Sequence, residues 1–227
     1  MSNSPQILFS QKRLSSGLLW LFAWVTGGFF LGLAFRADAA VVALVQTDSQ
    51  GWSRWIAGRV SHWGDWYGVL ALGLAAWFWG RRQGRRGVQR LLVLMGLCAA
   101  ISGLGANVIR ATTGRARPFA QAAPGWYGPS RGFRFSKNAR DFQSFPSAHT
   151  AVVAGFFAPL GLAALRKRRY ALVGLALAGT ALMMWARVWV GAHHVSDVCA
   201  SALLGWALGW AILRREQKTP RSGTTTL

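Results

Sequence analysis

Residues 88–109 of the chain read VQRLLVLMGLCAAISGLGANVI, and Arg90 is the only charged side chain in this run. At about 1.5 Å per residue, a helix over the run is long enough to cross the ~30 Å hydrocarbon layer of a membrane. Apolar runs of similar length predict membrane spans at 14–35, 63–80, 88–109, 148–165, 171–190 and 195–213. We therefore expect an all-α, polytopic protein of about six transmembrane helices, forming a single membrane domain over residues 1–227.

The segment before the second expected span is amphipathic, unlike the other runs. It covers residues 38–62 and carries Trp52 and Trp55, and Asp65 lies at the start of the span that follows. Amphipathic segments with tryptophan on one face suit the boundary between lipid and water. We expect residues 38–62 to lie in this interface rather than to cross the membrane.

The distribution of basic residues predicts the orientation of the chain. Under the six-span scheme, basic clusters at 12–13, 81–90, 166–169 and 214–218 all fall on one side of the membrane. Membrane proteins place such clusters in the cytoplasm. We expect cytoplasmic ends at 1–13 and 214–227, an outward-facing loop at 111–147, and a location in a bacterial inner membrane.

The formal net charge of +20 is also a feature of nucleic-acid-binding proteins. Such proteins gather their basic residues on one surface, whereas here the expected spans divide them between two sides of the membrane. The sequence therefore predicts no nucleic-acid partner. Nothing in it indicates an oligomeric state.

The 111–147 loop departs from the orientation rule because it is basic on the expected outer side. Loops of this length inside a compact protein are often functional. The charge rule does not account for its basic residues, which are Arg115, Arg117, Arg131, Arg134, Lys137 and Arg140.

A first polar motif, RATTGRARP at 110–118, stands at the outer end of the third expected span. The guanidinium groups of Arg110 and Arg117 offer paired donors that suit phosphate oxygens and stay charged at working pH. Arginines at the ends of spans also extend toward the interface without further function. By itself, the motif leaves both interpretations open.

A second motif, FPSAHT at 145–150, directly precedes the fourth expected span. Ser147 can cap a helix whose first free N–H groups, including that of Ala148, form an anion site. His149 follows, where it can protonate a departing oxygen. The alternative is an ordinary helix start with an interfacial histidine.

A third motif, RVWVGAHHVSD at 187–197, lies between the fifth and sixth expected spans. Arg187 adds another guanidinium group at the same face of the membrane. His193 and Asp197 are four residues apart, so on a helix the carboxylate can hold one ring nitrogen while the other is presented as nucleophile or base. The alternative is a structural hydrogen bond. All three motifs fall on one membrane face, which favours a shared phosphate site.

The three motifs together resemble the signature of the type 2 phosphatidic acid phosphatase (PAP2) superfamily, which includes vanadium haloperoxidases and bacterial acid phosphatases. That signature reads Lys-x6-Arg-Pro, Pro-Ser-Gly-His and Ser-Arg-x5-His-x3-Asp, and the order and internal spacings here are the same. The resemblance implies a PAP2/haloperoxidase-like helical core. The chain departs from the signature at Arg110, Ala148 and Ala186, where lysine, glycine and serine are usual.

The resemblance also implies a role for each site residue. His193 attacks phosphorus, Asp197 orients the His193 ring, and His149 protonates the leaving group. The phosphate oxygens are bound by Arg110, Arg117, Ser147, the Ala148 N–H and Arg187. No metal and no cofactor is implied. His194 is a rival nucleophile, but only His193 has the signature spacing to both Arg187 and Asp197.

The function that we expect is hydrolysis of a lipid phosphate or pyrophosphate at the outer face of the membrane, with membrane lipids as neighbours of the chain. A phosphotransferase that passes the same phosphohistidine to a second lipid is an alternative. So is a lipid-phosphate binder or transporter without turnover. The sequence leaves the lipid open among polyprenyl pyrophosphate, phosphatidic acid, phosphatidylglycerophosphate and lipid A.

Overall fold

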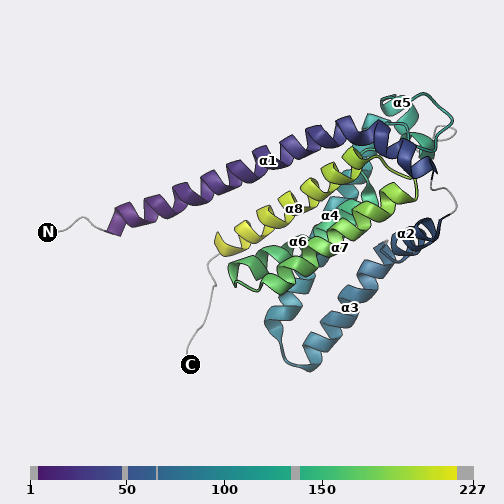
Figure 1. The fold of residues 1–227 in the computed structure, drawn as a ribbon. Coiled ribbons are helices and arrows are strands. Elements are labelled where there is room, and N and C mark those ends of the chain that lie inside the picture. Colours follow the sequence, from purple (N-terminus) through teal and green to yellow (C-terminus); the bar gives the residue numbers. More distant parts are fainter. Residues whose placement is uncertain (1–4, 48–50, 65, 134–138, 219–227) are drawn as a thin grey trace.

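The chain folds almost entirely into helices (Figure 1). This computed structural model describes residues 5–47, 51–64, 66–133 and 139–218, with side chains described from 21 to 215. Over these residues the only β pairing is an isolated bridge between Arg115 and Trp126. The predicted all-α fold class is confirmed.

The helices follow one another with short connections except between α4 and α6, where most of the expected 111–147 loop lies; its first three residues belong to α4. The longer helices are α1 (Pro5–Thr47), α4 (Arg86–Thr113), α6 (Ala148–Arg166), α7 (Tyr170–Trp189) and α8 (Val195–Lys218). The shorter ones are α2 (Trp52–Trp63), α3 (Trp66–Arg82), α5 (Pro129–Gly132) and the 3-10 helix η1 (Ala139–Phe142).

Helix α6 is the centre of the bundle and packs against α4, α7 and α8. Small residues allow this close approach. A Cβ added to Gly155 of α6 would lie 2.6 Å from the Cys98 carbonyl oxygen and from Ser102 Oγ of α4. Around this contact, Met95, Phe156 and other apolar side chains form the buried core. The core fixes the relative positions of the helix ends that carry the three motifs.

The Gly-x-x-x-Gly pair formed by Gly205 and Gly209 contributes to helix packing. A Cβ added to Gly205 of α8 would lie 2.6 Å from the Gly155 nitrogen, and one added to Gly209 would lie 2.6 Å from the Ala158 Cβ. By contrast, a Cβ added to Gly28 or Gly32 of α1 meets nothing within 4 Å among the described residues. Close packing through Gly205 and Gly209 therefore operates between α6 and α8, whereas Gly28 and Gly32 make no such contact among the described residues.

Among the described residues, five helices are long and apolar enough to cross a membrane: the Leu21–Thr47 part of α1, α4, α6, α7 and the Val195–Arg215 part of α8. These correspond to five of the six expected spans. The remaining one corresponds to α3, which has 17 residues. At about 1.5 Å per residue α3 is roughly 25 Å long, slightly less than the hydrocarbon layer.

The expected end of the first span, at residue 35, is wrong. Helix α1 continues through Thr47 and includes Asp38, which is buried. The carboxylate does not end the helix because it pairs with Arg115 and Ser196 inside the protein. The interfacial segment expected at 38–62 is therefore two elements: the end of α1 and the short amphipathic helix α2.

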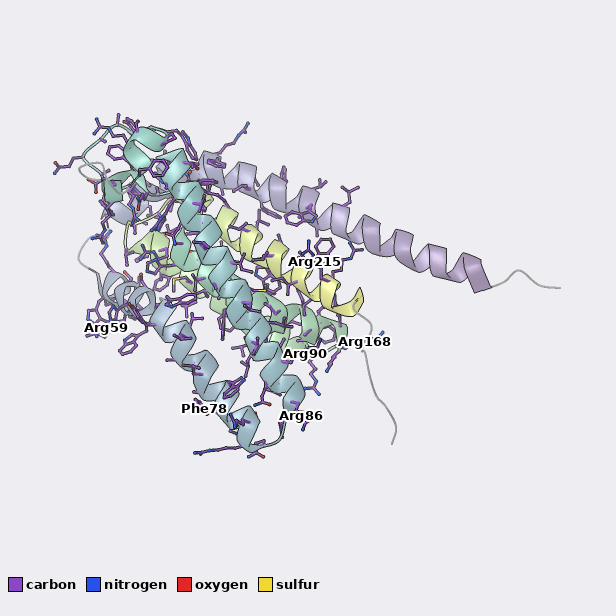
Figure 2. All side chains as sticks on the ribbon, turned by 180° about the vertical axis from the view of Figure 1, so that it is seen from behind. Arg59, Phe78, Arg86, Arg90, Arg168 and Arg215 are labelled. Carbon is purple, nitrogen blue, oxygen red and sulfur yellow. The ribbon has the colours of Figure 1, made fainter. Side chains whose placement is uncertain are left out.

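The two ends of the bundle differ. The start of α1 and the end of α8 lie away from α5 (Figure 1). Arg86, Arg90, Arg168 and Arg215 lie at this distant end too (Figure 2). Part of the sequence interpretation falls outside the described residues, namely Asp65, Arg134, Lys137 and residues 219–227.

Candidate active site

A cavity of about 910 Å³ lies at the end of the bundle that carries the long loop. Its lining includes one basic residue from each of four separate segments. Arg110 is in the last turn of α4, Arg117 is in the loop, His149 is in the first turn of α6, and Arg187 is in the last turn of α7. The three motifs therefore meet, as the topology predicted.

Local structure at two helix ends directs the chain around this cavity. Helix α4 ends at Gly114, whose left-handed φ of 60° needs glycine because a Cβ there would collide with the Gly128 carbonyl. Helix α6 begins at Ser147, whose Oγ accepts hydrogen bonds from the N–H and the hydroxyl of Thr150. These two ends turn Arg117 and His149 toward the same space.

Arg117 is a buried cation placed among other cations. It is only 8% exposed, and its Nε has no hydrogen-bond partner among the described residues. Burial lowers the pKa of Arg117 to about 9, and repulsion from Arg187, Arg110 and Arg140 acts in the same direction. A buried cation that has an unused donor and lies near other cations is stabilised by an anion.

His193 is held in one tautomer by the main chain. The ring is buried, and its Nδ1 lies 2.8 Å from the Ser144 carbonyl oxygen. Because a carbonyl oxygen can only accept, Nδ1 carries the proton, and Nε2 of the neutral ring keeps its lone pair. Burial lowers the pKa of His193 to about 3, with Arg117 and Arg187 adding to the shift. The ring is therefore neutral at physiological pH.

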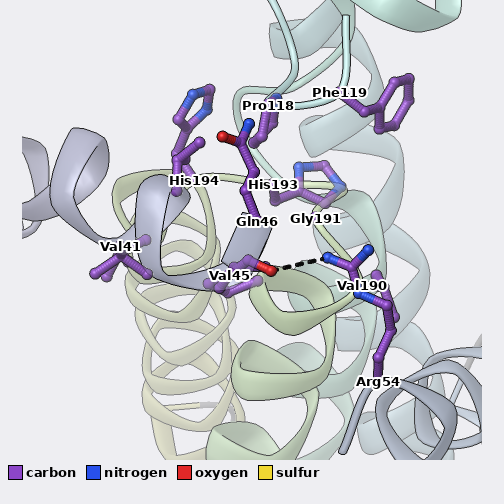
Figure 3. A pocket seen from close by; sticks show the side chains of 13 residues that line it. Val41, Val45, Gln46, Arg54, Pro118, Phe119, Val190, Gly191, His193 and His194 are labelled. Carbon is purple, nitrogen blue, oxygen red and sulfur yellow. Dashed lines mark hydrogen bonds between the residues drawn. The ribbon is translucent and has the colours of Figure 1, made fainter. Parts of the chain in front are cut away.

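A second, smaller cavity of about 210 Å³ lies beside the first and is lined by His193 (Figure 3). Phe119 and Val190 line both cavities, so the two are neighbours. Arg54 of α2 reaches into the smaller one and donates from Nη2 to the Val45 carbonyl at 3.2 Å. The imidazole of His193 thus lies next to the cluster of arginines.

Asp197 is fully buried in the first turn of α8. Its carboxylate accepts hydrogen bonds from Arg115, the Ser144 hydroxyl and the His194 N–H. The expected direct hydrogen bond to His193 is not formed, since the distance between Nδ1 and Oδ2 is 3.7 Å. The direct acceptor is the Ser144 carbonyl, and Asp197 lies behind it.

Comparison with known proteins identifies the family. The family model of the PAP2 superfamily matches residues 91–221, which contain all three motifs. The chain belongs to the PAP2 superfamily. This result confirms the resemblance seen in the sequence.

Two curated relatives are named lipid A 1-phosphatase. The one from Rhizobium etli is 40% identical over 114 residues, which are 48% of this chain and 42% of the relative. The one from Rhizobium johnstonii is 38% identical over 109 residues, which are 46% of this chain and 39% of the relative. The matched part of the chain thus spans about two fifths of the length of these relatives.

A solved structure shares the fold. It is the crystal structure of a transmembrane PAP2-type phosphatidylglycerolphosphate phosphatase from Bacillus subtilis, with a TM-score of 0.62 and 21% identity. The likeness covers 88% of this chain and 98% of that chain. Together with the apolar helices, it shows that this PAP2 chain is an integral membrane protein.

Ser147, a residue of the PAP2 signature, lies deeper than the sequence indicated. Ser147 is fully buried, and it is absent from the residues that line the large cavity. Its N–H lies 3.4 Å from the Asp197 carbonyl oxygen, so it joins α6 to α8. The Ala148 N–H is one of the first-turn amides that a helix cannot satisfy internally. Ala186 is fully buried, so its methyl group packs where the PAP2 signature has a serine.

His194, the rival nucleophile, has a structural position at the start of α8. Its N–H donates to Asp197 Oδ2 at 2.8 Å, and its Nδ1 lies 3.2 Å from the same oxygen. A carboxylate three residues into a helix that binds back to the preceding N–H is a common form of N-terminal capping. Both His193 and His194 line the smaller cavity, so what separates them is the pairing of His194 with Asp197 and the signature spacing of His193.

The sequence interpretation missed four residues that support the site: Asp38, Arg115, Ser144 and Ser196. Asp38 gave a usable signal, because an acidic residue beside an apolar run needs a partner. Arg115 also gave one, since it lies inside the first PAP2 motif, between Arg110 and Arg117. Neither signal names the partner, which comes from a distant segment in both cases.

Proposed function

We propose that this PAP2 protein is a membrane phosphatase that hydrolyses a lipid phosphate or pyrophosphate monoester through a phosphohistidine on His193. The observation that carries the proposal is the state of this ring. It is neutral, its Nδ1 proton is fixed on the Ser144 carbonyl, and Nε2 is left as the nucleophile. The ring lies beside a cavity lined by four arginines, including Arg110, Arg117 and Arg187, and by His62 and His149.

In the first step, the His193 Nε2 lone pair forms a bond to phosphorus, and the bond from phosphorus to the leaving oxygen breaks. The imidazolium of His149 gives its proton to that oxygen, so the lipid leaves as an alcohol, or as a monophosphate if the substrate is a pyrophosphate. In the second step, neutral His149 takes a proton from water, whose oxygen attacks phosphorus as the bond between phosphorus and His193 Nε2 breaks. Inorganic phosphate is released, and both histidines return to their starting state.

The arginines provide the charge for both steps. Arg110, Arg117 and Arg187 line the cavity together, and their planar donors suit the equatorial phosphate oxygens. Preorganised cations at developing negative charge are usually the largest catalytic contribution. This arrangement supports a mechanism that requires no metal ion, with the Ala148 N–H as an additional donor.

The charge distribution supports an active site that faces outward. The basic residues Arg86, Arg90, Arg168 and Arg215 lie at the end of the bundle distant from the site (Figure 2). The positive-inside rule puts that end in the cytoplasm. The lipid phosphate would then be hydrolysed at the outer face of a bacterial inner membrane.

The substrate that we place first is lipid A phosphorylated at the 1 position, because two relatives about two fifths identical over their matched parts are named for it. Phosphatidylglycerophosphate, phosphatidic acid and polyprenyl pyrophosphate complete the panel. The assay offers each labelled lipid in mixed micelles, with a chelator present, and measures release of inorganic phosphate.

Trapping of the intermediate tests the mechanism. Wild-type protein mixed with labelled lipid and denatured in alkali should carry label on His193. His193→Asn should carry none and lose roughly 10⁴-fold or more in turnover, as nucleophile variants do. His149→Asn should lose roughly 10²- to 10⁴-fold, and less with a p-nitrophenyl leaving group that needs no proton.

A matched control is Arg59→Met, which removes an exposed cation of α2 that stacks on Trp55 outside the cavity. Its turnover should equal that of the wild type. Full activity of His193→Asn, or a rate that the chelator abolishes, contradicts the proposal. Label on His193 that passes to an added lipid alcohol identifies a transferase, and substrate binding without label identifies a binder.

A further inference from the structure

A buried group of charged and polar side chains lies behind the nucleophile and joins α1 to α8. It consists of Asp38 on α1, Arg115 in the long loop, and Ser196 and Asp197 on α8; we call these four residues the Asp38 network. All four are at least nine-tenths buried, with exposed fractions of 6%, 9%, 0% and 0%. None of them lines the large cavity, so they have no direct access to a phosphate there.

Arg115 is the centre of the Asp38 network. Its Nη2 lies 2.7 Å from Asp38 Oδ2, and its Nη1 donates to Asp197 Oδ1 and, at 2.6 Å, to Ser196 Oγ. Asp38 in turn accepts from the Ser196 N–H at 2.9 Å. The guanidinium group also stacks on Trp126, with 4.9 Å between the Arg115 Cζ and the ring centroid. A planar fork that bridges two carboxylates on different helices has a single geometry.

Arg115 binds both groups that surround the ring of His193. Its side chain holds Asp197, whose carboxylate lies 3.7 Å from His193 Nδ1 and accepts from the Ser144 hydroxyl. Its main-chain carbonyl accepts from the Ser144 N–H at 3.1 Å. The carbonyl of that same Ser144 accepts the Nδ1 proton of His193. One residue thus fixes the nucleophile's hydrogen-bond acceptor and the charge behind it.

From this geometry we infer that Arg115 is a positioning residue for His193, and that Asp38 holds Arg115 in place from α1. The inference rests on the proposed function, because it assigns roles in the attack of His193 on phosphorus. The part that α1 contributes is new, since this helix lies outside the three signature motifs and outside residues 91–221. The Asp38 network makes α1 part of the catalytic apparatus.

The test compares steady-state kinetics of Arg115→Met, Arg115→Lys and Asp38→Asn with those of the wild type. Arg115→Met keeps the main-chain bond to Ser144 but removes the fork, so kcat should fall by roughly 100-fold, the scale seen for outer-shell partners. KM should change by less than about threefold, because the phosphate contacts remain. Arg115→Lys should recover part of kcat, because an ammonium group can bind one carboxylate at a time.

Asp38→Asn keeps an oxygen acceptor for the Ser196 N–H and removes one charge. Its kcat should fall by roughly 10-fold, and the double variant Asp38→Asn/Arg115→Met should be no slower than Arg115→Met alone. This non-additivity shows that Asp38 acts through Arg115. Arg59→Met is the matched control for loss of one cation, and thermal unfolding in detergent reports the stability of each variant.

The inference is overturned if Arg115→Met folds and turns over within about twofold of the wild type, or if KM rises while kcat is unchanged. If Arg115→Met does not fold, Arg115→Lys and Asp38→Asn decide: equal kcat to the wild type in both overturns the inference, and the graded losses above support it. If the wild type releases no phosphate from any substrate offered, the proposed function is overturned. That result differs from an active wild type whose variants have unchanged kcat, which overturns only the inference about Arg115.

Discussion

The neutral ring of His193 makes the folded protein sensitive to acid. Its folded pKa of about 3 lies below the usual value of 6.5, so the unfolded chain binds more protons between these two pH values. The stability that His193 contributes is fully present above about pH 6.5 and is lost as the pH falls toward 3. Melting temperatures measured in detergent from pH 8 to 4 should fall more steeply for the wild type than for His193→Asn. Parallel curves would contradict a buried neutral ring.

The lowered pKa of Arg117 predicts a decline of activity at alkaline pH. Its pKa is lowered to about 9, so in the free enzyme the guanidinium group loses its proton above that pH and with it the charge that binds phosphate. The value of kcat/KM, which reports groups of the free enzyme, should decline above about pH 9. Arg117→Gln should lower kcat/KM at neutral pH by roughly 100-fold and remove this decline. If kcat/KM of Arg117→Gln declined above pH 9 as in the wild type, the decline would be due to another group.

The motif residues were predictable because their spacing is local and the spans fix their membrane face. The loop charges that the positive-inside rule did not account for were the useful signal, and Arg117 is one of them. The acceptor for His193 was not predictable. Asp197 has the right spacing on a helix, but His193 precedes α8, and the carboxylate caps the helix through the His194 N–H instead.

Packing between α6 and α8 gives a prediction with an internal control. Gly205→Leu should force the two helices apart, because the added side chain meets the backbone of Gly155, and should destabilise the fold by about 1–3 kcal/mol. Gly28→Leu places the same side chain on α1, where nothing lies within 4 Å, and should change stability by less than about 0.5 kcal/mol. Thermal unfolding of both variants in the same detergent compares them. Equal losses would show that the contact is not specific.

Helix existence was predictable from apolar length, and helix ends were less so. The expected spans at 88–109, 148–165 and 171–190 lie within or close to α4, α6 and α7. The end of α1 was misplaced because hydropathy treats Asp38 as a stop, whereas the folded protein supplies Arg115 for it. A charge that is paired through tertiary contacts has no such effect on the helix, and the pairing is not local.

The two charged ends of the bundle make membrane orientation testable in intact cells. Ser130→Cys, exposed in α5, should react with a membrane-impermeant maleimide, whereas Gln83→Cys, exposed after α3, should react only after lysis. Both variants are made with Cys98 and Cys199 replaced by alanine. The reverse pattern would place the site in the cytoplasm and would contradict action at the outer face.

The proton acceptor of His193 belongs to the peptide backbone and not to any side chain. Replacement of Ser144 by another amino acid leaves the carbonyl where it is, so a side-chain scan can pass over this position while the ring keeps its tautomer. Conservation of the mechanism then depends more on the backbone conformation of residues 139–147 than on the identity of their side chains. A redesign that shortens this stretch by one residue endangers the nucleophile more than many point changes within it.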